Sequence, residues 1–242
     1  GKMTAMDTRR AAAAPQPSLW RRARRTLSRQ PIWGFVVLIF LFFSFSNEHF
    51  FALQNFENIL VQTSTIGLIA LGMTIVMING NIDLSVGAVL ALAASLAVDI
   101  QGWAMFADWG NWAILPGVAA GLGAGALLGA LNGLIVWKTG VGAFIVTLGA
   151  MLGVRGLVFV YTEEQSFYAM NFAYSDFGAS SVGPLPTLAL LFLAFTLAMH
   201  LLMSRTRHGR NAYAVGGNRE AAVNAGIRVG PHMLINFIIV GF

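Results

Sequence analysis

The sequence predicts an all-α fold, a polytopic bundle of transmembrane helices, from its composition, its apolar runs and the places of its charges. Hydrophobic residues make up 57% of the 242 residues and charged residues only 10%, whereas a soluble domain carries about 25% charged residues. The apolar residues gather into seven runs, several of them near the ~20 residues that a membrane-crossing helix requires. Nearly all charged residues lie before or between these runs, where loops would meet the two membrane surfaces.

Residues 1–30 are predicted to form a basic cytoplasmic tail ahead of a membrane domain that takes up residues 31–242. Eight of the fifteen Lys and Arg residues lie in this tail, where they would attract anionic lipid headgroups. A basic cluster also begins a signal peptide. Here the run that follows is too long and aromatic for one, and no A-x-A cleavage site follows it.

Six complete spans and a truncated seventh are predicted from the apolar runs. The runs cover residues 31–47, 59–79, 84–98, 112–137, 141–161, 185–203 and 233–242. The last run is too short to cross a membrane. We therefore expect the sequence to be a fragment of a longer protein that continues beyond residue 242.

The loop charges predict which side of the membrane each loop occupies. With a cytoplasmic N-terminus, every Lys or Arg outside a run falls on the cytoplasmic side, five of them from Arg205 to Arg228. The opposite loops carry carboxylates: Glu48, Glu57, Asp99, Asp108, Glu163, Glu164 and Asp176. Because cytoplasmic loops carry an excess of Lys and Arg, the sequence predicts a multi-pass membrane protein whose N-terminus is cytoplasmic.

A polar stretch separates the second run from the third: Asn79-Gly80-Asn81-Ile82-Asp83-Leu84-Ser85-Val86-Gly87. Its simplest interpretation is a tight turn in which Asp83 or Asn81 caps the following helix. The alternative rests on the rule that non-helical backbone at membrane depth is tolerated only where it is buried in protein or lines water. The stretch would then border a translocation path, and Asp83 would be an intramembrane ionisable group with a functional role.

The fourth run carries glycine at every fourth position: Gly117, Gly121, Gly125, Gly129 and Gly133. A face without side chains lets the backbone of a neighbouring helix approach closely, so this glycine stripe is predicted to be a helix-packing surface. The alternative is a helix that shifts on its neighbour during transport. Asn132, near the inner end of the run, is predicted to form an interhelical hydrogen bond.

Two features belong to the outer side of the predicted bundle. Arg155 lies about six residues, roughly 9 Å, inside the outer end of the fifth run, where it would extend to the interface or pair with Glu163 or Glu164. The outer segment 162–186 is rich in aromatic residues: Phe167, Tyr168, Phe172, Tyr174 and Phe177. These are predicted to lie at the membrane interface.

A polar, glycine-punctuated island, residues 209–227, lies between the last two runs. Asn218 can cap a helix start, Glu220 then lies in the first turn, where the helix dipole favours a negative charge, and Gly226 suits a left-handed residue at the end. The pattern predicts a helix of about two turns, roughly 10 Å long, that must be held by its neighbours. The alternative is a loop with a single helical turn.

One block of this island resembles the EAA-x-x-x-G signature of ABC-importer permeases: Glu220-Ala221-Ala222 followed by Gly226. Three further blocks look like the ribose and xylose branch of that family: Gly209-Arg210…Tyr213-Ala214-Val215-Gly216-Gly217-Asn218, Gly72-Met73…Ile82-Asp83-Leu84-Ser85-Val86-Gly87 and Ala143-Phe144-Ile145-Val146-Thr147-Leu148…Arg155-Gly156. The sequence departs from the family pattern at Asn81, where Gly is usual, and at Ile235-Asn236, where the general signature has Leu-Pro.

The resemblance implies the permease subunit of a monosaccharide importer in the bacterial plasma (inner) membrane. Residues 204–231, here the polar loop, would be the cytoplasmic coupling loop that docks on the ATPase through Asn218, Arg219, Glu220, Ala221, Ala222 and Gly226. The translocation path would include Asn79, Asn81, Asp83, Ser85 and Arg155. The implied partners are a cytoplasmic ABC ATPase subunit, a second permease subunit in a homodimer or heterodimer, an extracytoplasmic sugar-binding protein and the lipid bilayer.

Other function classes find less support in the sequence. The chain has no cysteine and no P-loop or H-E-x-x-H motif, so we expect no enzyme activity, no metal and no cofactor, with ATP hydrolysed by the partner subunit. Its positive charges flank the membrane runs rather than mark a nucleic-acid surface. The alternatives that stay open are an ABC permease for another small polar solute, and a channel or secondary transporter. The resemblance implies that the binding protein selects the sugar, so the sugar itself stays open.

Overall fold

The computed structural model describes residues 31–168 and 172–242 and divides into two compact units, Gly1–Phe56 and Glu57–Phe242. Its described residues are mainly helical, with one hairpin of two-residue strands, β1 (Ser181–Val182) and β2 (Leu185–Pro186). The all-α class is therefore confirmed. The predicted basic tail, residues 1–30, lies outside the described residues.

The first unit contains α2 (Pro31–Ser46), which is apolar on all sides and almost wholly exposed. A helix of this kind suits a lipid environment. After α2 the side chain of Asn47 accepts a hydrogen bond from the backbone N–H of His49 at 2.9 Å. The Phe50 ring packs edge-on against Phe40, with ring centroids 5.2 Å apart, so the chain turns back at the end of the helix.

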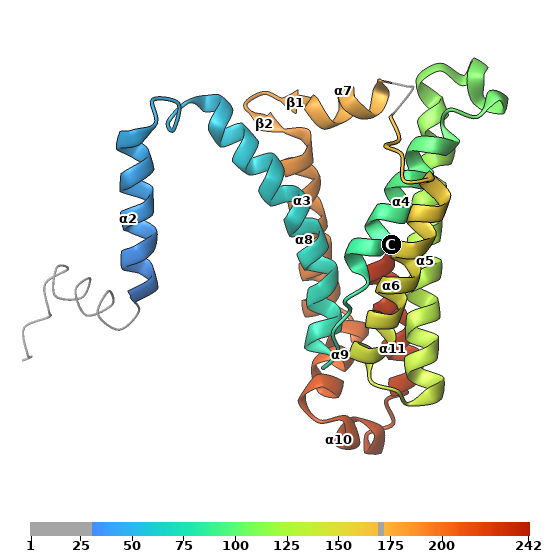
Figure 1. Cartoon of the computed structure of the whole chain (residues 1–242). Helices are drawn as coiled ribbons and strands as arrows, with labels where there is room; N and C mark the ends of the chain where they lie inside the picture. The colour runs from blue at the N-terminus through green and yellow to red at the C-terminus, as the bar shows by residue number, and fades with distance from the viewer. Residues whose placement is uncertain (1–30, 169–171) are drawn as a thin grey trace, which may run out of the picture. The chain divides into compact units, whose positions relative to one another are not determined.

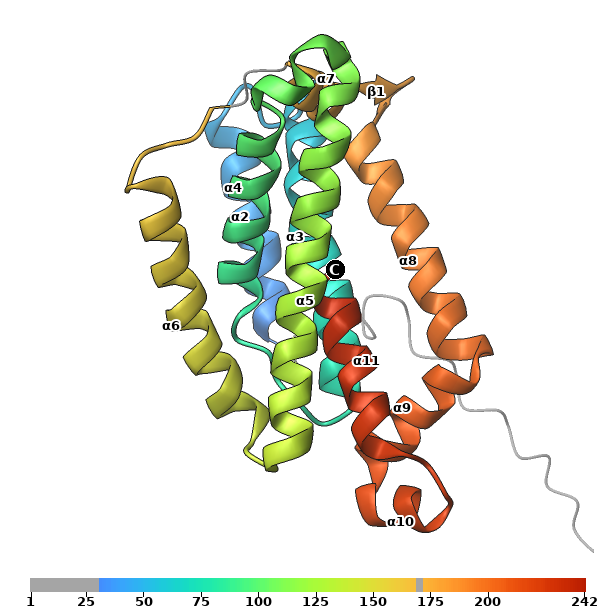
Figure 2. The same cartoon turned by 90° about the vertical axis from the view of Figure 1, so that its right-hand side faces the viewer.

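The second unit holds most of α3 and all later elements (Figures 1 and 2). In chain order the helices are α3 (Leu53–Ile78), α4 (Val86–Ile100), the 3-10 helix η1 (Ala104–Ala113), α5 (Ile114–Thr139), α6 (Ala143–Thr162), α7 (Ala173–Ala179), α8 (Thr187–Arg205), α9 (Arg207–Gly217), α10 (Arg219–Asn224) and α11 (Val229–Gly241). η1 and α7 lie at one end of this unit, and α9 and α10 lie at the opposite end (Figure 1).

Four helical segments of the described chain are long and apolar enough to cross a membrane by length and composition: α3, the continuous segment Ala104–Thr139, α6 and α8. The apolar helices α2, α4 and α11 are shorter, so the predicted count of six complete spans is met only in part. α4 has 15 residues and is about 22 Å long, against a hydrocarbon thickness of ~30 Å. It is short because residues 79–85 before it are not helical.

α5 is the centre of the second unit, and its glycine stripe is divided between two neighbouring helices. The first two glycines face α4: a Cβ built on Gly121 would stand 2.7 Å from the carbonyl oxygen of Ala93. The last three face α11: a Cβ built on Gly133 would stand 3.0 Å from the Cα atom of Leu234. All five glycines are buried, so two partners share one stripe.

The contact between α5 and α11 is backbone against backbone, and Figure 2 shows α11 lying along α5. A Cβ built on Gly125 would overlap the carbonyl oxygen of Gly241, and a Cβ built on Gly241 would overlap the carbonyl oxygen of Gly125. The two helices approach this closely because neither residue has a side chain. This geometry supports a packing role for the stripe.

The end of the unit that carries α7 is joined by hydrogen bonds. The hydroxyl of Tyr174 lies 3.2 Å from the carbonyl oxygens of Ala97 and Ile114, at the ends of α4 and α5. Tyr174 is therefore half-buried between helices rather than spread on a surface. Tyr168 and Phe172, which belong to the same segment 162–186, are exposed.

Candidate functional site

Local hydrogen bonds form α10 as its sequence predicts. The side-chain oxygen of Asn218 accepts the backbone N–H of Ala221 at 2.9 Å, which satisfies one of the free donors at the helix start. Glu220 is exposed in the first turn. Gly226 has φ +82°, the left-handed conformation that costs glycine least. The helix has six residues and so is slightly shorter than the two turns predicted.

A small apolar cluster holds α10 against the rest of the unit. Ala222 is 4% exposed and packs with Val215 of α9 and Val229 of α11. The predicted ATPase-contact residues therefore divide by exposure. Five of them are exposed: Asn218, Arg219, Glu220, Ala221 and Gly226. Ala222 points inward and anchors the helix.

The structure adds α9, a helix that was not predicted within the polar loop. Thr206 begins it by accepting the backbone N–H of Gly209 at 3.2 Å. The buried residues Gly209, Ala212 and Val215 follow at a spacing of three, which is the pattern of an amphipathic helix. That spacing and the capping Thr206 are the sequence signals that could have identified α9. α11 likewise begins at Val229, four residues before its predicted start.

The polar stretch between α3 and α4, residues 79–85, is here called the break. The C-terminal half of the break, which includes Asp83 and Ser85, is held in place by a chain of buried hydrogen bonds. The carboxylate of Asp83 accepts the backbone N–H of Ser85 at 2.8 Å and its hydroxyl at 2.6 Å. The side-chain amide of Asn132 on α5 donates to the same hydroxyl at 2.9 Å. Asp83 thus forms a turn just before α4, but the helix start at Ser85 has no side-chain cap, so the predicted cap by Asp83 or Asn81 is wrong. Asn132 makes the interhelical hydrogen bond that its position predicts.

Thr147 on α6 is a further residue of this network that was not singled out from the sequence. Its hydroxyl accepts the backbone N–H of Leu84 at 3.1 Å and donates to the carbonyl of Ala143 at 2.8 Å. The side chain is fully buried. A hydroxyl in an otherwise apolar run is a weak signal, because most such groups bond to their own helix. Only the fold brings it to the break.

The N-terminal half of the break, which begins at Asn79, lies against the polar loop. A Cβ built on Gly216, in the last turn of α9, would overlap the carbonyl oxygen of Ile78 and stand 3.4 Å from the Cα atom of Asn79. The last turn of α9 therefore rests directly on the backbone where α3 ends and the break begins. Sequence spacing does not predict this contact, since more than 130 residues separate its two sides.

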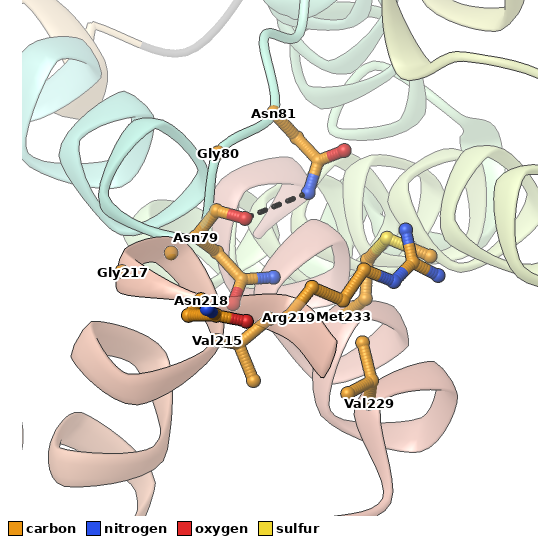
Figure 3. A pocket seen from close by; sticks show the side chains of 10 residues that line it. Asn79, Gly80, Asn81, Val215, Gly217, Asn218, Arg219, Val229 and Met233 are labelled. Carbon is orange, nitrogen blue, oxygen red and sulfur yellow. Dashed lines mark hydrogen bonds between the residues drawn. The ribbon is translucent and has the colours of Figure 1, made fainter. Parts of the chain in front are cut away.

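A pocket of about 240 Å³ opens at this junction (Figure 3). Its buried floor consists of Asn79, Val215, Val229 and Met233. Exposed residues form its rim: Gly80, Gly216, Gly217, Asn218 and Arg219. Asn81 also lines it and donates its side-chain amide to the carbonyl of Asn79 at 3.3 Å. We call this cavity the Asn79 pocket.

Four of the five predicted path residues belong to the break by their sequence positions, and the structure joins two of these four to the loop. Asn79 and Asn81 share a pocket with Asn218 and Arg219. Arg155 stands apart: it is exposed on α6, eight positions and about 12 Å along the axis from Thr147. Within residues 31–168 and 172–242, the structure has no ion pair between Arg155 and Glu163 or Glu164.

The comparisons with known proteins agree on one kind of relative. Residues 55–242 match the family described as branched-chain amino acid transport system / permease component. The chain is 37% identical over 205 residues to the D-allose transport system permease protein AlsC of Escherichia coli (strain K12), a match that covers 85% of this chain and 61% of that protein.

Two other relatives carry sugar names as well. The chain is 37% identical over 222 residues to the ribose import permease protein RbsC of Escherichia coli (strain K12), covering 89% of this chain and 66% of that protein. It is 32% identical over 203 residues to the xylose/arabinose import permease protein XylH of Sulfolobus acidocaldarius, covering 84% and 56%. The chain therefore spans less than two thirds of the length of these relatives. No solved structure matches it.

Proposed function

The chain belongs to the family of branched-chain amino acid transport system permease components, and on this basis we propose that it is the membrane-spanning permease subunit of an ATP-binding-cassette importer for a monosaccharide. It is a transport component and not an enzyme. A separate ATPase subunit would supply the energy, and an extracytoplasmic binding protein would deliver the sugar.

The substrate class rests on the relatives. The proteins named AlsC, RbsC and XylH are permeases for allose, ribose, and xylose or arabinose by their names. The chain shares 32–37% of its residues with them over most of its length. Among uncharged small solutes, monosaccharides are therefore the proposed class.

The contact of α9 with the break carries the mechanism. α10 presents Asn218, Arg219 and Glu220 at one end of the unit, and α9 connects it to the backbone at Ile78 and Asn79. An ATPase that binds α10 would push or pull on the break through this contact. The C-terminal half of the break is held by hydrogen bonds to α5 and α6. The break would therefore change shape as the translocation path passes between two states.

The orientation and the assembly follow from the same proposal. The end with α9 and α10 would be cytoplasmic, with the N-terminus on that side, because it carries the Lys and Arg residues of the polar loop. The binding protein would meet the opposite end, which carries η1 and α7. A second permease subunit, identical or related, would complete the pathway across large apolar surfaces that are exposed on one chain.

Reconstituted transport tests this function. The permease, its ATPase and its binding protein are placed in liposomes, and uptake of labelled D-ribose, D-allose and D-xylose is measured with ATP, without ATP, and without the binding protein. We expect uptake of one of these sugars that needs all components. Uptake without ATP would contradict the importer and indicate a channel or secondary transporter.

A second candidate is an amino acid permease, because the family description itself names branched-chain amino acids. Labelled leucine in the same liposomes separates the two. Leucine uptake without sugar uptake would replace the sugar as the proposed solute and leave the ATP-driven mechanism in place.

A further inference from the structure

The side chain of Asn79 is buried without a hydrogen-bond partner. It is 5% exposed, and both atoms of its amide, Nδ2 and Oδ1, lack a partner within the described residues. A buried amide without partners destabilises the folded protein, so native proteins normally pair such groups or supply them with a ligand or water. Figure 3 shows this amide directed toward Val215 and Asn218, into the Asn79 pocket.

The pocket is large enough for more than one water. Its volume of about 240 Å³ compares with the ~10–15 Å³ of probe-occupied space that a single water needs. Its walls are mixed: Val215, Val229 and Met233 are apolar, while Asn79 offers two donors and one acceptor. Placed polar groups beside apolar walls can fix the orientation of a small ligand.

The charges of the lining select the kind of ligand. Arg219 is the charged residue among those that line the pocket, and it is exposed on the rim. The floor is neutral, so it suits a neutral solute with hydroxyl groups that both donate and accept and with C–H surfaces that pack on valine and methionine. A monosaccharide has this chemistry.

We propose that the Asn79 pocket is a monosaccharide-binding site at the polar-loop end of the translocation path, in which the Asn79 amide bonds sugar hydroxyls. The proposal rests on the proposed function and identifies a site that the sugar occupies during its translocation. Gly216 and Gly217 form the rim of the pocket and belong to the helix that rests on the break. The same movement of α9 that alters the break therefore alters the site.

The test uses a substitution that removes the amide and keeps the shape. Asn79→Leu deletes both unpaired groups without leaving another, so the protein should be at least as stable as before. The matched control is Gln101→Leu. Gln101 is also buried, at 4% exposed, with both amide atoms unpaired, but it follows the far end of α4 and does not line the pocket.

A single cysteine reports occupation of the site. The chain has no cysteine, and a Cβ at Gly217 on the rim meets no atom within 4 Å, so Gly217→Cys is a tolerated reporter. The labelling rate with a maleimide is measured on the purified permease without its ATPase, because an ATPase docked on α10 would cover the rim of the pocket. D-ribose, D-allose or D-xylose is added at rising concentrations, with glycerol as the osmotic control.

We expect one of these sugars to slow labelling, with Gln101→Leu unchanged and Asn79→Leu needing about tenfold more sugar, the effect of one or two lost hydrogen bonds. Equal protection in Asn79→Leu, equal protection by glycerol, or no protection by any of the three sugars would overturn the site. If the reporter fails to assemble, equilibrium dialysis of labelled sugar against the purified cysteine-free permease makes the same comparison. Sugar uptake that proceeds in liposomes while no sugar binds here contradicts the site alone; absence of uptake contradicts the proposed function.

Discussion

Gly226 lets the chain leave α10 and turn back toward α11. Its φ of +82° is open to glycine but costs a residue with a side chain about 1–3 kcal/mol, and most for a β-branched one. α10 has six residues and relies on the buried Ala222 for its hold. A strain of that size is large against the stability of one short helix and small against that of the packed bundle.

Gly226→Val is therefore expected to displace α10 while the permease still inserts and folds. The measurement is a pull-down of the ATPase together with reconstituted uptake, both of which should fall. Ala225→Val is the control, because Ala225 is also exposed and has an ordinary φ of −80°. Full ATPase binding and full uptake in Gly226→Val would contradict the docking role of α10.

Glu220 tests the same surface without strain in the backbone. It lies exposed in the first turn, where its charge stabilises the helix start by about 0.3–1 kcal/mol. Glu220→Ala should weaken ATPase binding and uptake while leaving the thermal stability of the permease nearly unchanged. Unchanged binding and uptake in this variant would place the ATPase contact elsewhere.

The residues of α10 could be predicted from the sequence because a helix cap is a local matter. Asn218 and Ala221 are three positions apart, and Gly226 needs no distant partner to adopt its conformation. Thr147 could not be predicted, since its hydroxyl bonds to Leu84, more than 60 residues away. The unpaired amide of Asn79 could not be predicted either, because only the fold shows that no group of the described residues forms a hydrogen bond with it.

At the scale of elements, α9 connects the loop to the break. Gly216 is in contact with the backbone of Ile78, whereas a Cβ built on Gly217 beside it would meet no atom within 4 Å. Two adjacent glycines of one helix therefore differ in whether a side chain fits.

Gly216→Val is expected to push α9 off the break at a cost of about 1–3 kcal/mol from overpacking. Because α10 stays exposed, the ATPase should still bind and hydrolyse ATP, but sugar uptake should fall. Gly217→Ala is the control and should transport normally. Loss of ATPase binding together with uptake in Gly216→Val would show a collapsed loop and would contradict a separate transmission step.

The glycine stripe of α5 makes a second prediction at this scale. Gly125→Leu should force α11 away from α5 and lower the thermal midpoint of the purified protein, because the added atoms meet the backbone of Gly241. Leu127→Ala, at a side chain that is 61% exposed, should change stability by no more than about 0.5 kcal/mol. Normal assembly and transport by Gly125→Leu would mean that the stripe faces lipid or a cavity.

The stripe shows what a sequence pattern leaves open. Four-residue spacing of glycine predicts a close helix contact, and the structure has one. The pattern does not say that α4 takes the first two glycines and α11 the last three, since that depends on where two distant segments lie. The contact between the end of α9 and the end of α3 also depends on where two distant segments lie, and no pattern within the polar loop predicts it.

At the scale of the whole molecule, the charges and the fold agree on two opposite ends. η1, with Asp108, and α7, with Asp176, lie at one end of the second unit, and α10 lies at the other. The alternation of charged loops predicted this division, because each change of side follows one apolar run. The number of complete spans was harder to predict, because the first and third apolar runs were counted as spans although α2 and α4 are shorter than the ~20 residues that a span requires.

Which end is cytoplasmic stays a prediction, and single cysteines test it. The 242-residue chain has no cysteine, so Asp108→Cys, Asp176→Cys and Asn218→Cys can each be labelled alone in intact cells. A membrane-impermeant reagent should label the first two and label Asn218→Cys only after the cells are opened. Labelling of Asn218→Cys from outside would overturn the orientation.

The mutual contact of Gly125 and Gly241 limits how this protein can change. A clash between two side chains can be relieved by trimming either one, but each of these glycines meets the other's carbonyl oxygen, and a carbonyl has nothing to trim. No single compensating substitution at the partner position exists, because the partner is already the smallest residue. An alanine at either site is therefore tolerated only if the two helices move apart. Substitutions at these two positions can accumulate only after another change has already separated the helices.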